Sequence, residues 1–211
     1  KAHKKIIKQV ENREIDILVG TQMLTKGLDF RNVNLVGVMN ADSLLNFPDF
    51  RAHERAYQLM VQVSGRSGRS KKQGNVLIQT HNPHHQILQQ VSTNSYEEMF
   101  KEQLDERWQY HYPPFYRIIK IVLRHKDFNR VDDGANWLGK SLVSIFKENV
   151  LGPTTPGISK IRNYYIRHII IKIPQKQSLG ATKNNINKVK NSFQAIKEFR
   201  TIKFNIDVDN Y

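Results

Sequence analysis

The pattern of apolar residues changes at Pro113-Pro114, and this change constrains the fold more than any other feature of the sequence. Before the two prolines, short continuous apolar runs are separated by a helical pattern, as in a sheet whose strands are buried on both faces. After them, strands with alternating apolar residues are separated by amphipathic helices. Proline lacks an N–H donor and restricts the residue before it, so two in a row end a helix. The sequence therefore predicts two differently built parts.

The part before the prolines has the element order of an α/β fold. Apolar runs at residues 15–20, 34–42 and 74–80 predict buried parallel strands. Between the second and the third run, residues 51–63 place apolar side chains at helical spacing, namely Ala52, Ala56, Leu59 and Val63. Residues 84–110 are also helical, because they lack glycine and are rich in helix formers. This order predicts part of a parallel sheet with helices on it.

The part after the prolines predicts a small α+β domain. Strands are expected at residues 117–125, 163–173 and 201–209, and a proline-interrupted edge segment at 150–158. Two helices lie between them, marked by Val131, Ala135, Leu138, Leu142 and Ile145 and by Ile186, Val189, Phe193 and Ile196. The order β-α-β-β-α-β is that of a ferredoxin-like fold. We therefore divide the chain into residues 1–90, a helical connector at 91–114 and a domain at 115–211.

Charge is concentrated in the last of these three segments. The chain has 33 Lys and Arg against 19 Asp and Glu, a net charge of +14, and residues 115–211 alone hold 18 basic and 7 acidic side chains. A strongly basic small domain indicates a polyanionic partner, either nucleic acid or an acidic protein tail. The alternative is a basic, solvated surface without a specific partner.

Several classes of protein are disfavoured by composition. There are no cysteines, so this chain has neither disulfides nor thiolate metal sites. No run approaches the roughly 18 apolar residues that span a bilayer, and the first residues lack the apolar core of a signal peptide. We expect a cytoplasmic protein without a membrane partner.

The most specific pattern is Q-x-x-G-R-x-G-R at residues 62–69, which follows a predicted helix. Transfer of a phosphoryl group needs cationic donors where negative charge spreads in the transition state. Arginine suits this task because its guanidinium can pair with two phosphate oxygens. Arg66 and Arg69, three residues apart and flanked by glycines, are therefore candidates for binding one phosphate. The alternative is a basic loop on a solvated face.

A second segment begins directly after the run at residues 15–20. Loops at the carboxyl ends of parallel strands are where α/β sheets bind ligands. Thr21, Gln22 and Thr25 offer hydroxyl and amide groups to a nucleic-acid backbone. Gly27 permits close approach to a phosphate or sugar, and Asp29 can orient an arginine or contact a ribose. The alternative is a simple connector between two strands.

Together, these two segments resemble motifs V and VI of the superfamily 2 helicases. Within that superfamily, the sequence from Ile17 to His85 is similar to the DNA helicases of replication restart. Further matches are Tyr112–Phe115, Leu151–Pro153 and Asp207–Asp209; Asn210 stands where the family usually has proline. The resemblance implies a fragment of an ATP-dependent 3′→5′ DNA helicase acting in replication restart and primosome assembly. It further implies that residues 1–90 are part of the second of two RecA-like motor lobes.

Roles follow from the resemblance residue by residue. It implies that Arg69 is the arginine finger and Arg66 a second phosphate contact. Gln62, Gly27 and Asp29 are implied on the ATP side. Thr21, Gln22 and Lys26 are the candidates for DNA contact in the motor.

The cofactors are implied to be ATP and Mg²⁺. The sequence contains neither a phosphate-binding G-x-x-x-x-G-K-[ST] pattern nor a D-E-x-H box. In the resembled family both lie in the first motor lobe, upstream, and a cysteine-rich zinc insertion also lies upstream. We therefore expect the nucleotide and any zinc to be held mainly upstream, and the fragment alone to be inactive. His81, His84 and His85 predict a polar turn rather than a metal site.

The basic domain carries a second set of candidates, in which aromatic and basic residues alternate between Lys160 and His168. Such a surface suits nucleic acid, with Arg162 and Arg167 as the DNA contacts. A sheet face covered by long side chains is the alternative. The resembled family binds DNA forks and single strands, the acidic tail of single-strand-binding protein and other primosome proteins. Lys172 and Lys176 are the candidates for contact with that tail.

Two other functions remain compatible with the sequence. One is a noncatalytic module that binds DNA or protein and retains a degenerate motor half. The other is a superfamily 2 helicase acting on RNA. The intact pair of arginines argues against degeneration, because an adaptor has no use for them.

Overall fold

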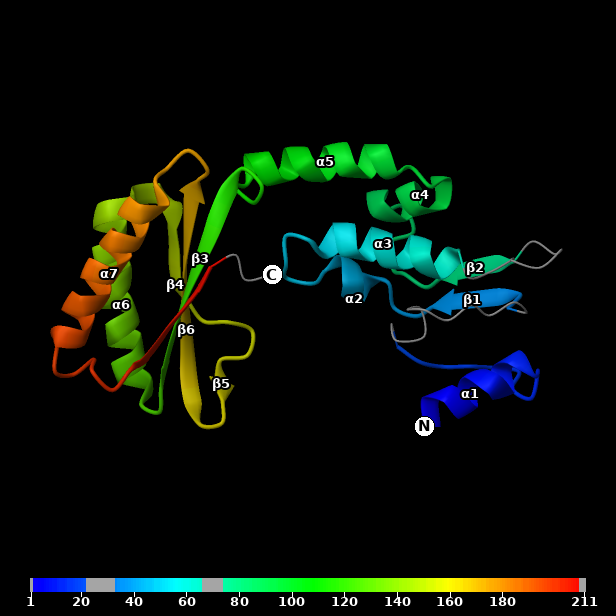
Figure 1. Ribbon diagram of the computed structural model, residues 1–211, viewed down its shortest axis with the longest axis horizontal. Coiled ribbons are helices and arrows are strands. Elements are labelled where there is room, and N and C mark those ends of the chain that lie inside the picture. Colours follow the sequence, from blue (N-terminus) through cyan, green and yellow to red (C-terminus); the bar gives the residue numbers. More distant parts are fainter. Residues whose placement is uncertain (1, 22–32, 66–73, 209–211) are drawn as a thin grey trace. The chain divides into compact units, whose positions relative to one another are not determined.

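The structure is a computed structural model that describes residues 2–21, 33–65 and 74–208 of the 211-residue chain (Figure 1). The chain divides into two compact units, residues 1–105 and 106–211. Because no observation tests them, the expected boundaries at residues 90 and 114 remain predictions. Within the described part of the chain, no helix is both long and apolar enough to cross a membrane.

The described residues of the first unit form a short parallel sheet and five helical elements. In chain order these are α1 (Ala2–Glu11), β1 (Leu35–Val38), α2 (Asp42–Leu45), α3 (Ala52–Ser64), β2 (Asn75–Ile78), α4 (Gln86–Thr93) and α5 (Tyr96–Gln109), the last of which continues into the second unit. Strands β1 and β2 pair in parallel, with Leu35 opposite Asn75 and Val38 opposite Ile78. The predicted α/β character with a parallel sheet is confirmed.

Helix α3 forms because its apolar residues recur at helical spacing on one side. Ala52, Ala56 and Met60 are four residues apart and all three are buried. Ala56 and Met60 belong to a core formed by the residue before α2 and by residues of α2, α3, α4 and α5: Ala41, Leu45, Ala56, Tyr57, Met60, Ile87, Leu88, Val91 and Met99. Helix α4 ends at Asn94, whose φ of 55° is the left-handed conformation that ends many helices. The single helical segment expected at residues 84–110 is therefore two helices.

The strand predicted at residues 15–20 is wrong. These residues form neither helix nor strand, and the side chains of Ile17 and Val19 are 81% and 89% exposed. An apolar run becomes a strand only where a neighbouring strand pairs with its backbone donors and acceptors. In the described part of the first unit, that pairing is found between β1 and β2. The burial expected at 34–42 and 74–80 is likewise too high, since β1 and β2 alternate between exposed and half-buried residues.

The second unit is a mainly antiparallel sheet covered on one face by two helices (Figure 1). Its elements are β3 (Tyr116–His125), α6 (Phe128–Phe146), the short 3₁₀ turn η2 (Lys147–Asn149), β4 (Val150–Thr154), β5 (Lys160–Ile161), β6 (Tyr164–Pro174), α7 (Leu179–Ala195) and β7 (Lys203–Val208). The sheet order is β4-β6-β3-β7, with β5 paired to β6. Strand β4, which carries Pro153, lies at the edge as expected.

Alternation along the strands decides which side chains meet the helices. Ile119, Ile121 and Leu123 of β3 are buried, as predicted, and Ile169, Ile171 and Ile173 of β6 lie with them. Helices α6 and α7 supply the other half of this core, including Val131, Ala135, Leu138, Leu142, Ile186, Val189 and Phe193. Because side chains alternate between faces, the residues between these strand positions lie on the opposite face. We call that opposite side of the β4-β6-β3-β7 sheet the open face.

Candidate functional site

Helix α3, in which the arginine motif begins, is stabilised by core contacts and hydrogen bonds up to its last residue. Met60 is fully buried and Gln62 is exposed on the same helix, α3. The Ser64 hydroxyl donates to the Met60 carbonyl at 2.7 Å, and the Gly65 N–H donates to the Val61 carbonyl at 3.0 Å. The chain is thus anchored at the point where the motif begins. Arg66 and Arg69 themselves lie outside the described residues.

The second candidate segment is described only at its start. Thr21 is exposed and belongs to neither a helix nor a strand. Gln22, Lys26, Gly27 and Asp29 lie outside the described residues. Their predicted roles therefore stay predictions.

A polar clamp joins the carboxyl ends of β1 and β2. The Asp42 carboxylate accepts hydrogen bonds from the Thr80 hydroxyl at 2.7 Å and from the His81 backbone N–H at 2.9 Å. These bonds, the Thr80 bond above all, lower the pKa of Asp42 below its ordinary value. The Ala41 N–H also donates to the Gln79 carbonyl at 2.9 Å. Sequence reasoning did not find this clamp, because its partners are nearly forty residues apart.

The histidines after β2 have structural contacts. His85 precedes α4, and its Nδ1 accepts from the Ile87 N–H at 3.2 Å. Its ring meets the ring of His53 edge-on, with centroids 5.3 Å apart. Burial and, to a smaller degree, His53 lower the pKa of His85. Among the described residues, no group of three or more His, Asp or Glu side chains is arranged to hold a metal ion.

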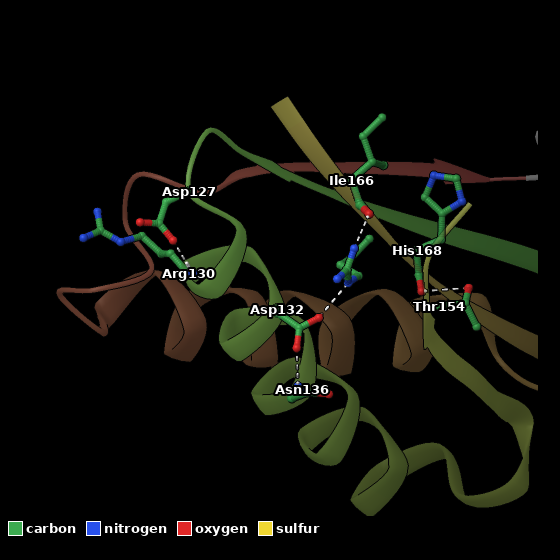
Figure 2. Close-up of polar contacts among 8 residues, drawn as sticks. Asp127, Arg130, Asp132, Asn136, Thr154, Ile166 and His168 are labelled. Carbon is green, nitrogen blue, oxygen red and sulfur yellow. Dashed lines mark hydrogen bonds and ion pairs between the residues drawn. The ribbon is translucent and has the colours of Figure 1, made fainter. Parts of the chain in front are cut away.

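The two arginines proposed for DNA contact in the second unit lie in opposite environments. Arg162 is exposed in the two-residue turn between β5 and β6, where it and Asn163 both have positive φ. Arg167 is buried: its Nε donates to Asp132 Oδ1 at 2.7 Å and its Nη1 to the Ile166 carbonyl at 3.1 Å (Figure 2). Its guanidinium also lies 4.9 Å from the centre of the Phe128 ring. These contacts fasten β6 to α6.

The two lysines proposed for partner contact also differ. Lys172 is buried, and its ammonium donates to the Tyr110 carbonyl and lies 3.8 Å from the centre of the Tyr112 ring. Burial lowers the pKa of Lys172. Lys176 is exposed in the turn that follows β6. Only Lys176 of the two is freely presented to solvent.

The open face gathers basic residues that sequence reasoning did not connect. His168 of β6 lies opposite Val122 of β3, so Lys120 and Arg124 are its diagonal neighbours. Burial, followed by these two cations, lowers the pKa of His168 to about 4. Figure 2 shows its ring on the side of the strand away from the helix that carries Asp132. The alternation in residues 117–125 places Lys120 and Arg124 on one face, but only the strand register brings them to His168.

A second group of basic residues lies around Tyr164, where the end of β3 meets the starts of β6 and β7. The ring of Tyr164 is contacted by two ammonium groups, those of Lys203 at 4.4 Å and Lys126 at 5.9 Å from its centre. Lys203 stands directly opposite Arg124 on the neighbouring strand. Two ammonium groups that are 77 residues apart in the sequence therefore contact one aromatic ring.

Comparisons with known proteins agree with both units. Residues 1–71 match the family model described as "Helicase conserved C-terminal domain", and residues 109–211 match "Primosomal protein N C-terminal domain". The "Replication restart protein PriA" of Bacillus subtilis is 35% identical over 216 residues, covering all of this chain. The chain belongs to the PriA family.

Other PriA proteins give the same result. The PriA of Synechocystis is 38% identical over 82% of this chain, and that of Borreliella burgdorferi is 34% identical over 95% of it. The chain spans between 21% and 30% of the length of these three relatives. The resemblance to replication-restart helicases inferred from the motifs is confirmed, and the first unit corresponds to a helicase lobe.

Proposed function

We propose that this chain is part of an ATP-dependent 3′→5′ DNA helicase that acts in replication restart and primosome assembly. In this proposal the first unit is the second RecA-like lobe of the motor, and the second unit is a ferredoxin-like domain that binds nucleic acid. The protein acts in the cytoplasm. Motion of one lobe against the other, driven by hydrolysis, steps the DNA.

One observation carries the proposal: the Gln62–Arg69 pattern begins in the last turn of α3, a helix with one buried side, inside the segment that matches a helicase domain. The core contacts of α3 fix the position of the helix in which the motif begins. Arg66 and Arg69 then stabilise the charge that develops on the γ-phosphate. Gln62, Gly27 and Asp29 line the nucleotide side, while Thr21, Gln22 and Lys26 contact DNA.

ATP and Mg²⁺ are held mainly by residues outside this sequence. The chain offers amide and guanidinium groups, which suit phosphate oxygens, but it contains no phosphate-binding G-x-x-x-x-G-K-[ST] pattern. We expect the 211 residues alone not to hydrolyse ATP. Zinc, which needs ligands such as cysteine, is likewise expected outside this cysteine-free chain.

The second unit supplies contacts to DNA and to other proteins. Its exposed turn residues Arg162 and Lys176 are suited to polyanions, the first to DNA forks and single strands, the second to the acidic tail of single-strand-binding protein. Arg167 and Lys172, which were proposed for the same two partners, reach them only if their present contacts break. The β4-β6-β3-β7 order and the two covering helices support the ferredoxin-like assignment.

The arginine finger is tested by the Arg69→Ala change in the full-length protein. We expect DNA-stimulated ATP hydrolysis to fall by a factor of about 10³ or more, as for other arginine fingers, while fork binding stays nearly unchanged. Steady-state ATPase rates and fork-binding titrations measure the two effects.

The matched control is Arg55→Ala on α3, which removes an arginine of the same unit that pairs with Asp49 at 2.7 Å. It should leave the turnover of ATP close to that of the unchanged protein. If Arg69→Ala hydrolysed ATP at a near-normal rate, the motor role would be wrong and a noncatalytic module would be favoured. ATPase activity that responds to RNA and not to DNA would favour an RNA helicase.

A further inference from the structure

The open face of the second unit differs from the helix-covered face in charge. Its described strand residues include the basic side chains Lys120, Arg124, His168, Lys172 and Lys203. Among those strand residues a single one is acidic, Asp207, which stands opposite Lys120. Apolar side chains such as Val122, Ile166 and Ile170 lie between the cations. Val122, Ile166 and Lys172 are buried, so the exposed cations of this face lie at the end that carries Lys126 and Lys203.

Two of its cations lack an anionic partner within the described chain. The Arg124 Nε is buried and makes no hydrogen bond. The Arg124 side chain as a whole is partly exposed, so its other N–H groups can donate to an oxygen from outside the chain. Lys203, directly opposite Arg124, contacts the Tyr164 ring rather than a carboxylate. Burial, followed by repulsion from Lys120 and Arg124, lowers the pKa of His168 and keeps it uncharged near neutral pH.

The spacing of the cations suits a chain of phosphates. Lys120 and Arg124 are four residues apart on β3, about 13 Å at the usual rise of a strand, and Lys126 follows two residues later. The rise per phosphate along one strand of B-DNA is about 3.4 Å, and an unstacked single strand places its phosphates farther apart, so this row is long enough for two or more of them. Arg162, exposed at the β5–β6 turn beside Tyr164, extends the basic surface.

We propose that the open face is the surface on which the second unit binds single-stranded nucleic acid. Arg124, Lys126 and Lys203 contact phosphates of the nucleic acid. When Lys126 and Lys203 move from the Tyr164 ring to these phosphates, the ring stacks on an unpaired base. This assignment rests on the proposed DNA-binding role of the unit. An aromatic ring among the cations favours a single strand over a duplex, because stacking needs an unpaired base. It also favours nucleic acid over an acidic peptide, which has no bases to stack.

The test uses the full 211-residue chain and a fluorescein-labelled oligothymidine, with binding followed by fluorescence anisotropy. The triple change Arg124→Gln, Lys126→Gln and Lys203→Gln should weaken binding about tenfold or more. It should also reduce the slope of log K against log salt by about 2, since each single-strand phosphate contact contributes about 0.7. Tyr164→Leu should weaken binding by about fivefold or more through lost stacking.

Two control variants separate this face from net charge and from misfolding. The triple change Lys140→Gln, Lys183→Gln and Lys188→Gln removes the same charge from exposed positions of α6 and α7 and should leave affinity within about twofold, because phosphate contacts are local. The charge-preserving triple Arg124→Lys, Lys126→Arg and Lys203→Arg should retain binding. Far-ultraviolet circular dichroism verifies that each variant is folded.

Four results would overturn the assignment. Equal losses in the two glutamine triples would show an effect of net charge alone. Unchanged oligothymidine binding in the open-face triple would place the nucleic acid elsewhere, and loss of polyglutamate binding by that triple alone would assign the face to an acidic protein. If the unchanged chain bound no oligothymidine at low salt, the proposed DNA-binding role of the second unit would fail together with this assignment.

Discussion

At the scale of single residues, position on a sheet face decides what a basic side chain can do. Arg167 and His168 are neighbours in sequence, yet Arg167 is paired with Asp132 under the helices and His168 lies on the open face. Both belong to the same basic and aromatic stretch, whose composition predicted a nucleic-acid surface without separating its two faces. Such a separation needs the strand register, because a shift of one residue exchanges the faces.

His168 should make the stability of the second unit depend on pH. Its pKa is lowered to about 4, whereas the ordinary value is 6.5, so the unfolded chain binds more protons between these pH values. The free energy of unfolding should therefore fall as the pH is lowered from 6.5 towards 4. Urea denaturation at several pH values, followed by tryptophan fluorescence, measures this for the second unit, which contains both tryptophans.

His168→Gln should flatten that pH dependence, since glutamine has no proton to gain. His84→Gln is the matched control, because it replaces an exposed histidine of the first unit. If His168→Gln and the unchanged chain lost stability with the same slope, the histidine would not be the group responsible.

At the scale of elements, the periodicity of apolar residues correctly predicted helices and strand faces that depend on local spacing. The spacing of Ala52 and Ala56 gave α3, and the alternation of Ile119, Ile121 and Leu123 gave the buried face of β3. The run at residues 15–20 failed because strand formation depends on a partner that no local pattern reveals. The clamp between Asp42 and Thr80 was beyond sequence reasoning for the same reason: it depends on how two strand ends meet.

The packing of α6 against the edge strand can be tested at one glycine. A Cβ atom at Gly139 would lie 2.9 Å from Cδ of Pro153, closer than real Cβ atoms approach other atoms. Gly139→Ala should therefore lower the free energy of unfolding by about 1–3 kcal/mol, although alanine favours helix by about 1 kcal/mol. Urea denaturation with tryptophan fluorescence gives the value.

Gly180→Ala in α7 is the matched control. Its nearest atom is Oγ of Ser178 at 3.8 Å, so the added methyl group meets ordinary contacts and the substitution should stabilise by up to about 1 kcal/mol. Equal effects of the two substitutions would show that α6 and β4 are not packed as closely as described.

At the scale of the whole molecule, the net charge and the arginine motif indicated the protein family. The basic face of the second unit became visible only in the three-dimensional structure. The excess of basic residues after Pro114 indicated a polyanion, and the Gln62–Arg69 pattern indicated a motor. Neither indicated that the basic residues of β3, β6 and β7 would converge on one face, because they are up to 83 positions apart between Lys120 and Lys203. The roles assigned around Arg66 and Arg69 remain proposals for the complete protein.

The most direct test of the proposed helicase is the direction of unwinding by the full-length protein. Two DNA duplexes of the same sequence, one with a 3′ single-stranded tail and one with a 5′ tail, are incubated with ATP and Mg²⁺, and strand separation is followed over time. We predict ATP-dependent separation of the 3′-tailed duplex and little separation of the other. Separation of neither duplex, or only of the 5′-tailed one, would contradict a 3′→5′ DNA helicase.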